Sequence, residues 1–224
     1  MKVSVVIPSY NNWQLTHSLL LNIYKHLPQD VEIIVVDDCS PEKGITEGLL
    51  WWKTTLLSVR LRTFVNDKNF GFLRTANFGV SKASGDVVIL INTDVSINDS
   101  TLVPKILKAL EHPEPTLVGC RLLSGDTGWN KDSNGTIYPY LEGWLLAFKK
   151  DKWDEYGGFD LRYTQGDFED VDISTTYLSH NGNLISIDMD VVHLGAQSYK
   201  YSPEREANTK LNQNRFFEKW SKNG

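Results

Sequence analysis

Between residues 87 and 94 the chain reads Val87-Val88-Ile89-Leu90-Ile91-Asn92-Thr93-Asp94, with five apolar residues before an amide, a hydroxyl and a carboxylate. An unbroken apolar run rich in β-branched residues predicts a strand covered on both faces, as in parallel sheets. Ligands of open α/β sheets bind beyond the carboxyl ends of such strands. The oxygens of Asn92 and Asp94 would emerge there on one side and suit a hard divalent cation that carries phosphate. The alternative is that Asp94 caps the helix expected from Thr101, although residues 98–100 suit that purpose better.

The composition is that of an ordinary globular protein. The chain has 224 residues, of which 41% are hydrophobic and 23% charged, and its net charge of −5 argues against a general nucleic-acid binder. No run approaches the roughly 18 apolar residues of a transmembrane segment, and the N-terminal apolar run is too short for a signal peptide. Cys39 and Cys120 show no metal or redox spacing. We therefore expect a soluble, cytoplasmic protein in a reducing compartment.

The first 65 residues alternate between strand and helix patterns. The expected elements are a strand at Val3–Ile7 stopped by Pro8, a helix capped by Asn11 or Asn12, a strand at Val31–Val36, a helix from Ser40-Pro41 through Leu57, and a strand at Val59–Val65. This order predicts a doubly wound, nucleotide-binding half. GxGxxG and GxxxxGK[ST] motifs are absent, which argues against a Rossmann dehydrogenase and a P-loop NTPase.

Arg74 opens a short predicted helix that runs to Ala83. A positive charge at a helix N-terminus opposes the helix dipole, so this arginine either has a partner elsewhere or is simply solvated.

The segment Gly166–Ile173 carries four carboxylates in six residues, at Asp167, Glu169, Asp170 and Asp172. The dipole of the helix that they open explains one or two acidic residues, but four of them repel one another. Crowded carboxylates raise one another's pKa values, which is a way to make a general base.

His193 follows a short predicted strand, and it is either structural or the third member of a metal site with Asp94. Beyond Ser198 the composition becomes polar and basic, and Ala207, Leu211, Phe217 and Trp220 are compatible with one helical face. We expect residues 1–198 to form one domain, with a nucleotide-binding half (1–97) and a second half (98–198). The tail, residues 199–224, is expected to be helical. It packs on the body, covers the site, or joins a second copy as a homodimer.

Taken together, these motifs resemble the family 2 glycosyltransferases, which have the GT-A fold. The matching segments occur in the family's order and are Val5–Asn11, Val35–Ser40, Asn69–Phe72 with Asn77, Asn92–Asp94, Gly157–Asp160, Phe168–Asp172 and Val192–His193. The resemblance implies an α/β fold with a single doubly wound, mostly parallel central sheet flanked by helices.

The resemblance also implies roles for individual residues. Asn92-Thr93-Asp94 stands where the family carries its DxD motif, so Asp94 with His193 would hold Mn²⁺ or Mg²⁺, and Asp170 matches the family's catalytic base, with Glu169 beside it. Residues expected to bind the donor are Pro8, Tyr10, Asp38, Asn69, Gly71, Arg74, Asn77, Asn92, Thr93 and Asp94. Residues 98–198 would be the half that binds the acceptor. The wall of the acceptor site would be formed by Gly143, Trp144 and Asp160, since an aromatic ring can stack on a sugar.

These expectations amount to a metal-dependent inverting glycosyltransferase of the hexosyltransferase type. It would move a sugar from a nucleotide donor, with UDP as the family's usual nucleotide, to a hydroxyl of a glycan, lipid-linked or other acceptor. One alternative is a non-catalytic sugar-nucleotide or glycan-binding module of the same fold, which Asn92 supports. A second is a sugar-phosphate nucleotidyltransferase, but Pro8-Ser9-Tyr10-Asn11 stands where such enzymes carry a Gly-rich loop.

Overall fold

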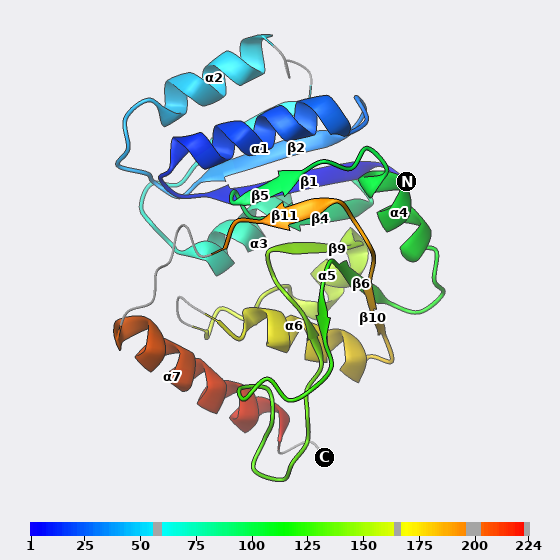
Figure 1. Cartoon of the computed structure of the whole chain (residues 1–224). Helices are drawn as coiled ribbons and strands as arrows, with labels where there is room; N and C mark the ends of the chain where they lie inside the picture. The colour runs from blue at the N-terminus through cyan, green and yellow to red at the C-terminus, as the bar shows by residue number, and fades with distance from the viewer. Residues whose placement is uncertain (56–59, 164–166, 196–202, 222–224) are drawn as a thin grey trace.

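A computed structural model describes residues 1–55, 60–163, 167–195 and 203–221 of the chain, and one central sheet organises them (Figure 1). Within these residues the sheet has seven strands in the order β10-β6-β9-β4-β1-β2-β3. They are β1 (Val3–Ser9), β2 (Glu32–Asp37), β3 (Leu61–Val65), β4 (Val87–Ile91), β6 (Thr116–Gly119), β9 (Leu145–Lys149) and β10 (Asn183–Ser186).

The sheet is mostly parallel, as predicted. Strands β1 to β4 pair in parallel, and so do β6 and β10. Only β9 among the described strands of this sheet runs against its neighbours, β4 and β6. Because β9 is reversed, the turn before it lies at the carboxyl end of β4, where the sequence places Asn92 and Asp94.

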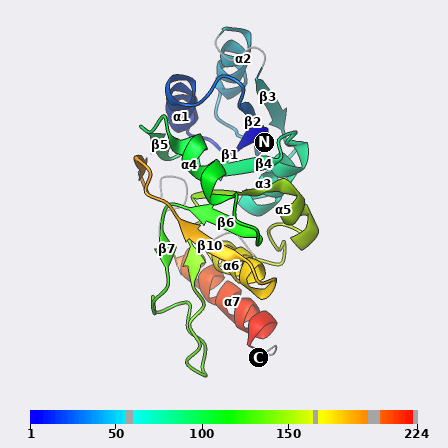
Figure 2. The same ribbon diagram turned by 90° about the vertical axis from the view of Figure 1, so that its right-hand side faces the viewer.

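Helices cover both faces of the sheet. One face is covered by α1 (Trp13–His26), α2 (Ile45–Thr55) and α4 (Leu102–Ala109). The other is covered by α3 (Phe72–Lys82), α5 (Lys150–Tyr156) and α6 (Glu169–Ser179), and α7 (Pro203–Trp220) packs against this group through Phe216. Figure 2 shows α1 and α4 on one side of the strands and α3 and α5 on the other. Consecutive residues of a strand point to opposite faces, so Val5 packs on the first group and Val6 on the second. No described helix is long and apolar enough to cross a membrane.

Two small antiparallel pairs complete the described strands. β5 (Val95–Ile97) pairs with β11 (Val191–His193), and β7 (Leu122–Leu123) pairs with β8 (Tyr140–Leu141). In the first pair His193 lies opposite Val95, the residue after Asp94. β5 was not predicted, and it is this short strand that brings His193 to the end of β4.

Several local predictions were wrong because contacts distant in sequence replaced the expected caps. β1 does not stop at Pro8 but continues to Ser9, whose carbonyl accepts the N–H of Asp38. Asn12 makes no side-chain capping bond, and the N–H of Trp13 donates to the Glu42 carboxylate instead. α2 begins at Ile45 rather than at Pro41.

Predictions for the second half of the chain also differ from the structure. Residues 117–123, whose sequence also predicts a single strand, are divided between β6 and β7. Asp94 does not cap α4: the capping residue is Thr101, which makes no side-chain capping bond and whose N–H donates to Asp99 at 2.7 Å. Leu57, Val59 and the expected domain boundary at Ser198 lie outside the described residues.

The tail is helical, as predicted. Phe217 and Trp220 of the expected face pack against the core, whereas Ala207 and Leu211 are exposed. Leu211 is 42% exposed, whereas the buried residues of α7 are Thr209, Asn212 and Phe216. These side chains pack on the same chain, as in the first of the three alternatives for the tail, and this packing gives the expected homodimer no support.

Gly79 tests the packing of α3 on the sheet. A Cβ at this position would lie 2.5 Å from Cγ1 of Val6 and 3.2 Å from Cγ2 of Val36. Gly79→Ala should therefore lower the free energy of unfolding by about 1–2 kcal/mol in urea titrations, because overpacking outweighs the gain in helix propensity. Gly125→Ala is the control, since a Cβ there meets nothing within 4 Å. Equal stability of the two variants would contradict this packing.

Candidate active site

One cavity of about 690 Å³ lies at the carboxyl ends of β1, β2 and β4. Its size is within the range of small-molecule sites. The predicted site residues that line it are Pro8, Tyr10, Asp38, Asn69, Gly71, Arg74, Asn92, Thr93, Asp94, Gly143, Trp144, Glu169, Asp170 and His193. Residues from both halves of the chain therefore meet in a single cavity.

Asp94 and His193 form one corner of the cavity. The Asp94 carboxylate is buried at the end of β4, and its Oδ2 lies 3.4 Å from Nε2 of His193. The His193 ring stacks on Trp144, with centroids 5.1 Å apart and planes 14° from parallel. Trp144 in turn donates from Nε1 to the Glu142 carboxylate at 2.9 Å. The imidazole is thus held in orientation by an aromatic residue from the turn before β9.

This corner fits a divalent cation only when other groups complete its coordination. No set of three or more His, Cys, Asp or Glu side chains in the described part of the chain could hold a metal ion alone. A carboxylate and an imidazole are nevertheless suitable ligands for Mn²⁺. The buried Oδ1 of Asn92 has no hydrogen-bond partner among the described residues, and such an atom is costly unless a ligand engages it. The donor set therefore fits a cation that takes its remaining ligands from a bound diphosphate and water.

Asp38 organises the opposite rim of the cavity. Its buried carboxylate accepts the N–H of Phe70 at 2.9 Å, the N–H of Gly71 at 2.8 Å and the Asn66 amide at 2.7 Å. Gly71 has a φ of 83°, a conformation that favours glycine. Asp38 thus fixes the loop that carries Asn69 and Gly71.

Asp170 is held by the turn before β9. The N–H of Gly143 donates to its Oδ2 at 3.2 Å, and the N–H of Val171 donates to its Oδ1 at 2.8 Å. A Cβ on Gly143 would lie only 3.1 Å from the Cβ of Asp170. Gly143, which was expected in the acceptor wall, lines the cavity, and its lack of a Cβ lets the side chain of Asp170 approach its backbone.

Glu169 and Asp170 are adjacent carboxyl groups whose pKa values are both raised. Burial is the main cause that raises the pKa of each carboxyl group above its ordinary value, and at Glu169 the charge of Asp170 adds to it. At Asp170 the N–H groups of Val171 and Gly143 act in the opposite direction. A carboxylate pair with a raised pKa is suited to accept a proton from a neutral group.

Two predicted site residues lie outside this cavity. The Asn77 amide exchanges two hydrogen bonds with the backbone of Phe159, at 2.8 and 3.0 Å. Asp160 pairs with Arg162 and with Lys219. Both line a second cavity of about 330 Å³. Their side chains hold the chain together rather than face the space between Asp94 and Asp170.

The cavity also contains residues that the sequence reasoning did not single out, chiefly Tyr163 and Arg205. Arg205 is near the N-terminus of α7, where a cation opposes the helix dipole. The argument that singled out Arg74 would also have found Arg205. Tyr163 has no comparable signal, because its position depends on contacts with α6 and α7.

Residues 4–169 match the family model described as Glycosyl transferase family 2. The chain belongs to this family. It is 30% identical over 128 residues to a dolichol-phosphate mannosyltransferase of Pyrococcus furiosus, a match that covers 56% of this chain and 34% of that protein. It is 28% identical to the uncharacterized glycosyltransferase YwdF of Bacillus subtilis, over 69% of this chain and 53% of that one. The chain thus spans about a third to a half of the length of these relatives.

Solved structures of glycosyltransferases share the fold. The mannosyltransferase PcManGT of Pyrobaculum calidifontis, in complex with GDP-Man and Mn²⁺, superposes with a TM-score of 0.77 at 21% identity, over 100% of this chain and 65% of that one. GalNAc-T7 with UDP, GalNAc and Mn²⁺ gives 0.75 at 18% identity, over 99% of this chain and 49% of that one. The fold of the chain is the GT-A fold, as predicted.

Asp38→Ala tests how the rim of the site is held. The substitution leaves three N–H donors without their carboxylate, so we expect a loss of about 3 kcal/mol or more in the free energy of unfolding. Hydrogen exchange of the Phe70 and Gly71 amides should accelerate more than exchange in β4. Asp67→Ala, at an exposed position of the same loop, is the control. Unchanged exchange at Phe70 and Gly71 would mean that another contact fixes the loop.

Proposed function

We propose that the protein is a metal-dependent, inverting glycosyltransferase that moves a sugar from a nucleotide donor to an acceptor hydroxyl. The observation that carries the proposal is that one cavity contains both the Asp94–His193 pair and the Glu169–Asp170 pair. A cation site on one side and a base on the other are the two parts that a displacement at an anomeric carbon needs.

The donor would lie across the ends of β1, β2 and β4. Pro8, Tyr10 and Asp38 line the part of the cavity proposed for the nucleoside, and Arg74 offers an exposed guanidinium to the diphosphate. UDP is the expected nucleotide. GDP and dTDP donors are alternatives, and the solved relatives include one with GDP-Man and one with UDP.

Asp94 and His193 would hold Mn²⁺ or Mg²⁺, which when bound supplies a Lewis acid for the negative charge of the departing diphosphate. Trp144 keeps His193 in place. The buried Oδ1 of Asn92 is available as a further oxygen ligand beside Asp94 and His193.

Asp170 would act as the base. Its carboxylate takes the proton of the acceptor hydroxyl while the hydroxyl oxygen bonds to the anomeric carbon. The bond from that carbon to the phosphate oxygen breaks, and the nucleoside diphosphate leaves with the electron pair. One displacement from the face opposite the leaving group inverts the anomeric centre.

The charge of the cavity favours a neutral acceptor. Glu142, Asp167, Glu169 and Asp170 line the acceptor side, against Arg205. A phosphate acceptor is already ionised, needs no base and is repelled by these carboxylates. Some relatives are named as transferases of dolichol phosphate or undecaprenyl phosphate. For this chain we propose instead a hydroxyl of a glycan or of a lipid-linked sugar.

One observation favours a second candidate, a non-catalytic sugar-nucleotide-binding module. Asn92 stands at the first position of the DxD motif and brings no negative charge. Incubation of the protein with Mn²⁺ and a panel of nucleotide sugars separates the two functions. A glycosyltransferase slowly hydrolyses its donor, whereas a binding module leaves it intact.

Asp94→Ala should abolish the metal-dependent part of donor binding. In calorimetry with UDP, we expect the wild type to bind at least about 10-fold more tightly with Mn²⁺ than with a chelator, and the variant to show no such difference. Asp86→Ala, on the opposite end of β4, is the control. Equally tight binding by the wild type with a chelator present would refute the metal assignment.

Asp170→Asn should lower the transfer rate by about 10²- to 10⁴-fold while donor affinity is retained.

The wild type should lose transfer as pH falls, because Glu169 and Asp170 cannot accept a proton once they are protonated. Since burial raises these pKa values, the loss should begin well above the ordinary carboxyl value of about 4.

The comparison variant for this experiment is Glu169→Gln, which keeps Asp170 and should shift the acidic limb of the pH profile downward. Near-normal transfer by Asp170→Asn would move the base to Glu169.

A further inference from the structure

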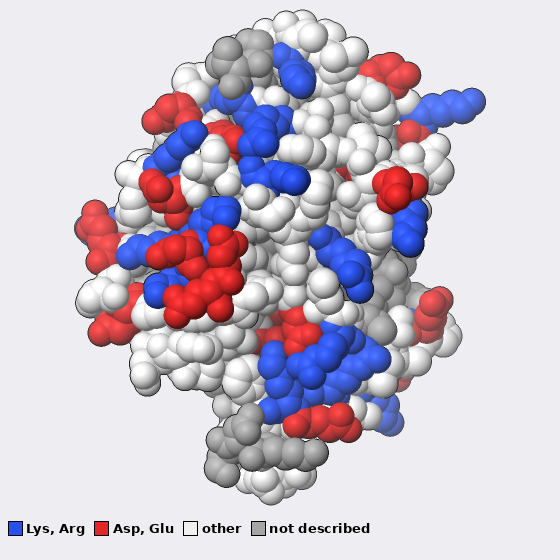
Figure 3. Space-filling view, turned by 180° about the vertical axis from the view of Figure 1, so that it is seen from behind, with Lys and Arg blue, Asp and Glu red and all other residues white. Residues whose placement is uncertain are grey.

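The C-terminal helix α7 reaches the acidic segment, residues 167–172, at both ends. In the view of Figure 3 basic side chains gather over α7 next to acidic ones. Two of these carboxylates, Asp167 and Asp172, are engaged by residues of α7, and Asp167 lines the cavity together with Glu169 and Asp170.

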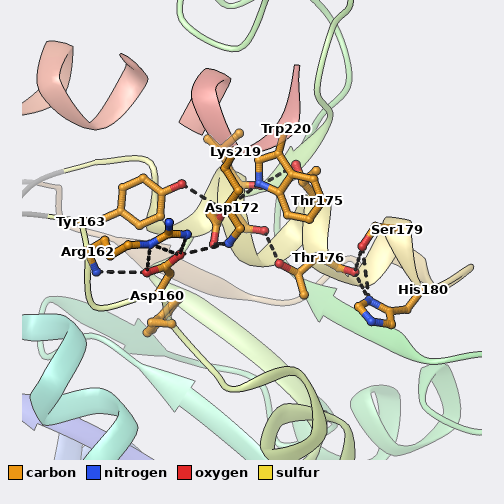
Figure 4. Close-up of polar contacts among 12 residues, drawn as sticks. Asp160, Arg162, Tyr163, Asp172, Thr175, Thr176, Ser179, His180, Lys219 and Trp220 are labelled. Atoms are coloured by element: carbon orange, nitrogen blue, oxygen red, sulfur yellow. Dashed lines mark hydrogen bonds and ion pairs between the residues drawn. The ribbon is translucent and has the colours of Figure 1, made fainter. Parts of the chain in front are cut away.

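Asp172 is the anchor at the C-terminal end of α7. It is 2% exposed and accepts three hydrogen bonds: from Lys219 Nζ at 2.8 Å, from Trp220 Nε1 at 2.7 Å and from the Tyr163 hydroxyl at 3.0 Å (Figure 4). Tyr163 lines the cavity. A buried carboxylate requires such partners. Asp172 thereby connects Lys219 and Trp220 of α7 to Tyr163, a side chain of the cavity wall.

Lys219 extends this connection to the turn that follows α5. Its ammonium group also lies 3.1 Å from Asp160, and Arg162 binds the same carboxylate (Figure 4). The turn between Asp160 and Tyr163 contributes Leu161 and Tyr163 to the cavity wall. Lys219 therefore bridges the cavity wall and α6.

The N-terminal part of α7 holds the other end of the acidic segment. Arg205 and Thr209 donate to the Asp167 carboxylate at 2.9 and 2.6 Å, and the buried Asn212 amide donates to the Asp167 carbonyl at 3.0 Å. Asp167 and Phe168 have φ values of 56° and 79°, which non-glycine residues adopt only when their surroundings hold them. These two residues immediately precede Glu169 and Asp170.

We propose that α7 is a positioning element of the active site, in which Lys219 and Trp220, through Asp172, fix the orientation of α6 and of Tyr163 toward the reacting groups. Asp167 and Asp172 are each engaged by α7, and Glu169 and Asp170, which lie between them in the sequence, line the cavity. The catalytic consequence rests on the proposed function, whereas the positioning itself does not.

The test compares Lys219→Met and Trp220→Phe with Lys210→Met, which removes a lysine from an exposed position of the same helix. For the first two variants we expect kcat of transfer to fall on the order of 10- to 100-fold, because small displacements of reacting groups are costly. The Kd for UDP with Mn²⁺ should change less than about 2-fold, since neither Lys219 nor Trp220 is among the described residues that line the cavity. Lys210→Met should match the wild type in both.

Hydrogen exchange supplies the readout that does not depend on activity. Residues 160–163 and 167–171 should exchange faster in Lys219→Met and Trp220→Phe but not in Lys210→Met. Unchanged kcat and unchanged exchange in folded Trp220→Phe, the milder variant, would overturn the proposal even if Lys219→Met failed to fold. An inactive wild type with faster exchange in the variants would refute the proposed function and leave the positioning intact.

Discussion

Two adjacent backbone groups in the turn before β9 hold the two halves of the site together. The carbonyl of Trp144 accepts the N–H of Asn92 at 2.9 Å, and the N–H of Gly143 donates to Asp170. One contact reaches the end of β4, which carries Asp94, and the other reaches the start of α6. Because β9 is antiparallel to β4, this turn lies at the ligand-binding edge of the sheet. Gly143 permits the contact because it has no Cβ.

Charge is the second constraint on the site. Asp94 is buried beside His193, and four more carboxylates lie between residues 167 and 172. So many acids in one region repel one another unless cations or N–H donors engage them. Residues of α7 engage the outer carboxylates, Asp167 and Asp172, and the two carboxyl groups between them, whose pKa values burial raises, line the cavity. Arg74 and Arg205, two cations that oppose their own helix dipoles, both lie at this cavity.

Predictions from the sequence succeeded where the physical signal is local. The apolar run from Val87 to Ile91 is the strand β4, with the same bounds, and the clustered acids begin α6. Sequence reasoning also selected Asp94, Asp170 and His193, which line one cavity although they are far apart in the chain.

The failures arise from contacts that no local pattern encodes. Asn77 matches a motif, yet its amide binds the backbone of Phe159, 82 residues away. In α7, polar Asn212 is buried while Leu211 is exposed. The reason is that the Asn212 amide donates a hydrogen bond to the carbonyl of Asp167, a residue with a strained backbone. Burial of polar groups in a helix depends on the partner that they meet, and helical periodicity does not show that partner.

The most direct test is a crystal structure of the protein with UDP and Mn²⁺, in which anomalous scattering locates the metal. The account predicts a manganese peak between the Asp94 carboxylate and the diphosphate, with His193 as a neighbour and the outer phosphate oxygen facing the space in front of Asp170. A peak away from Asp94, or a diphosphate bound outside the cavity that Asp170 lines, would contradict it.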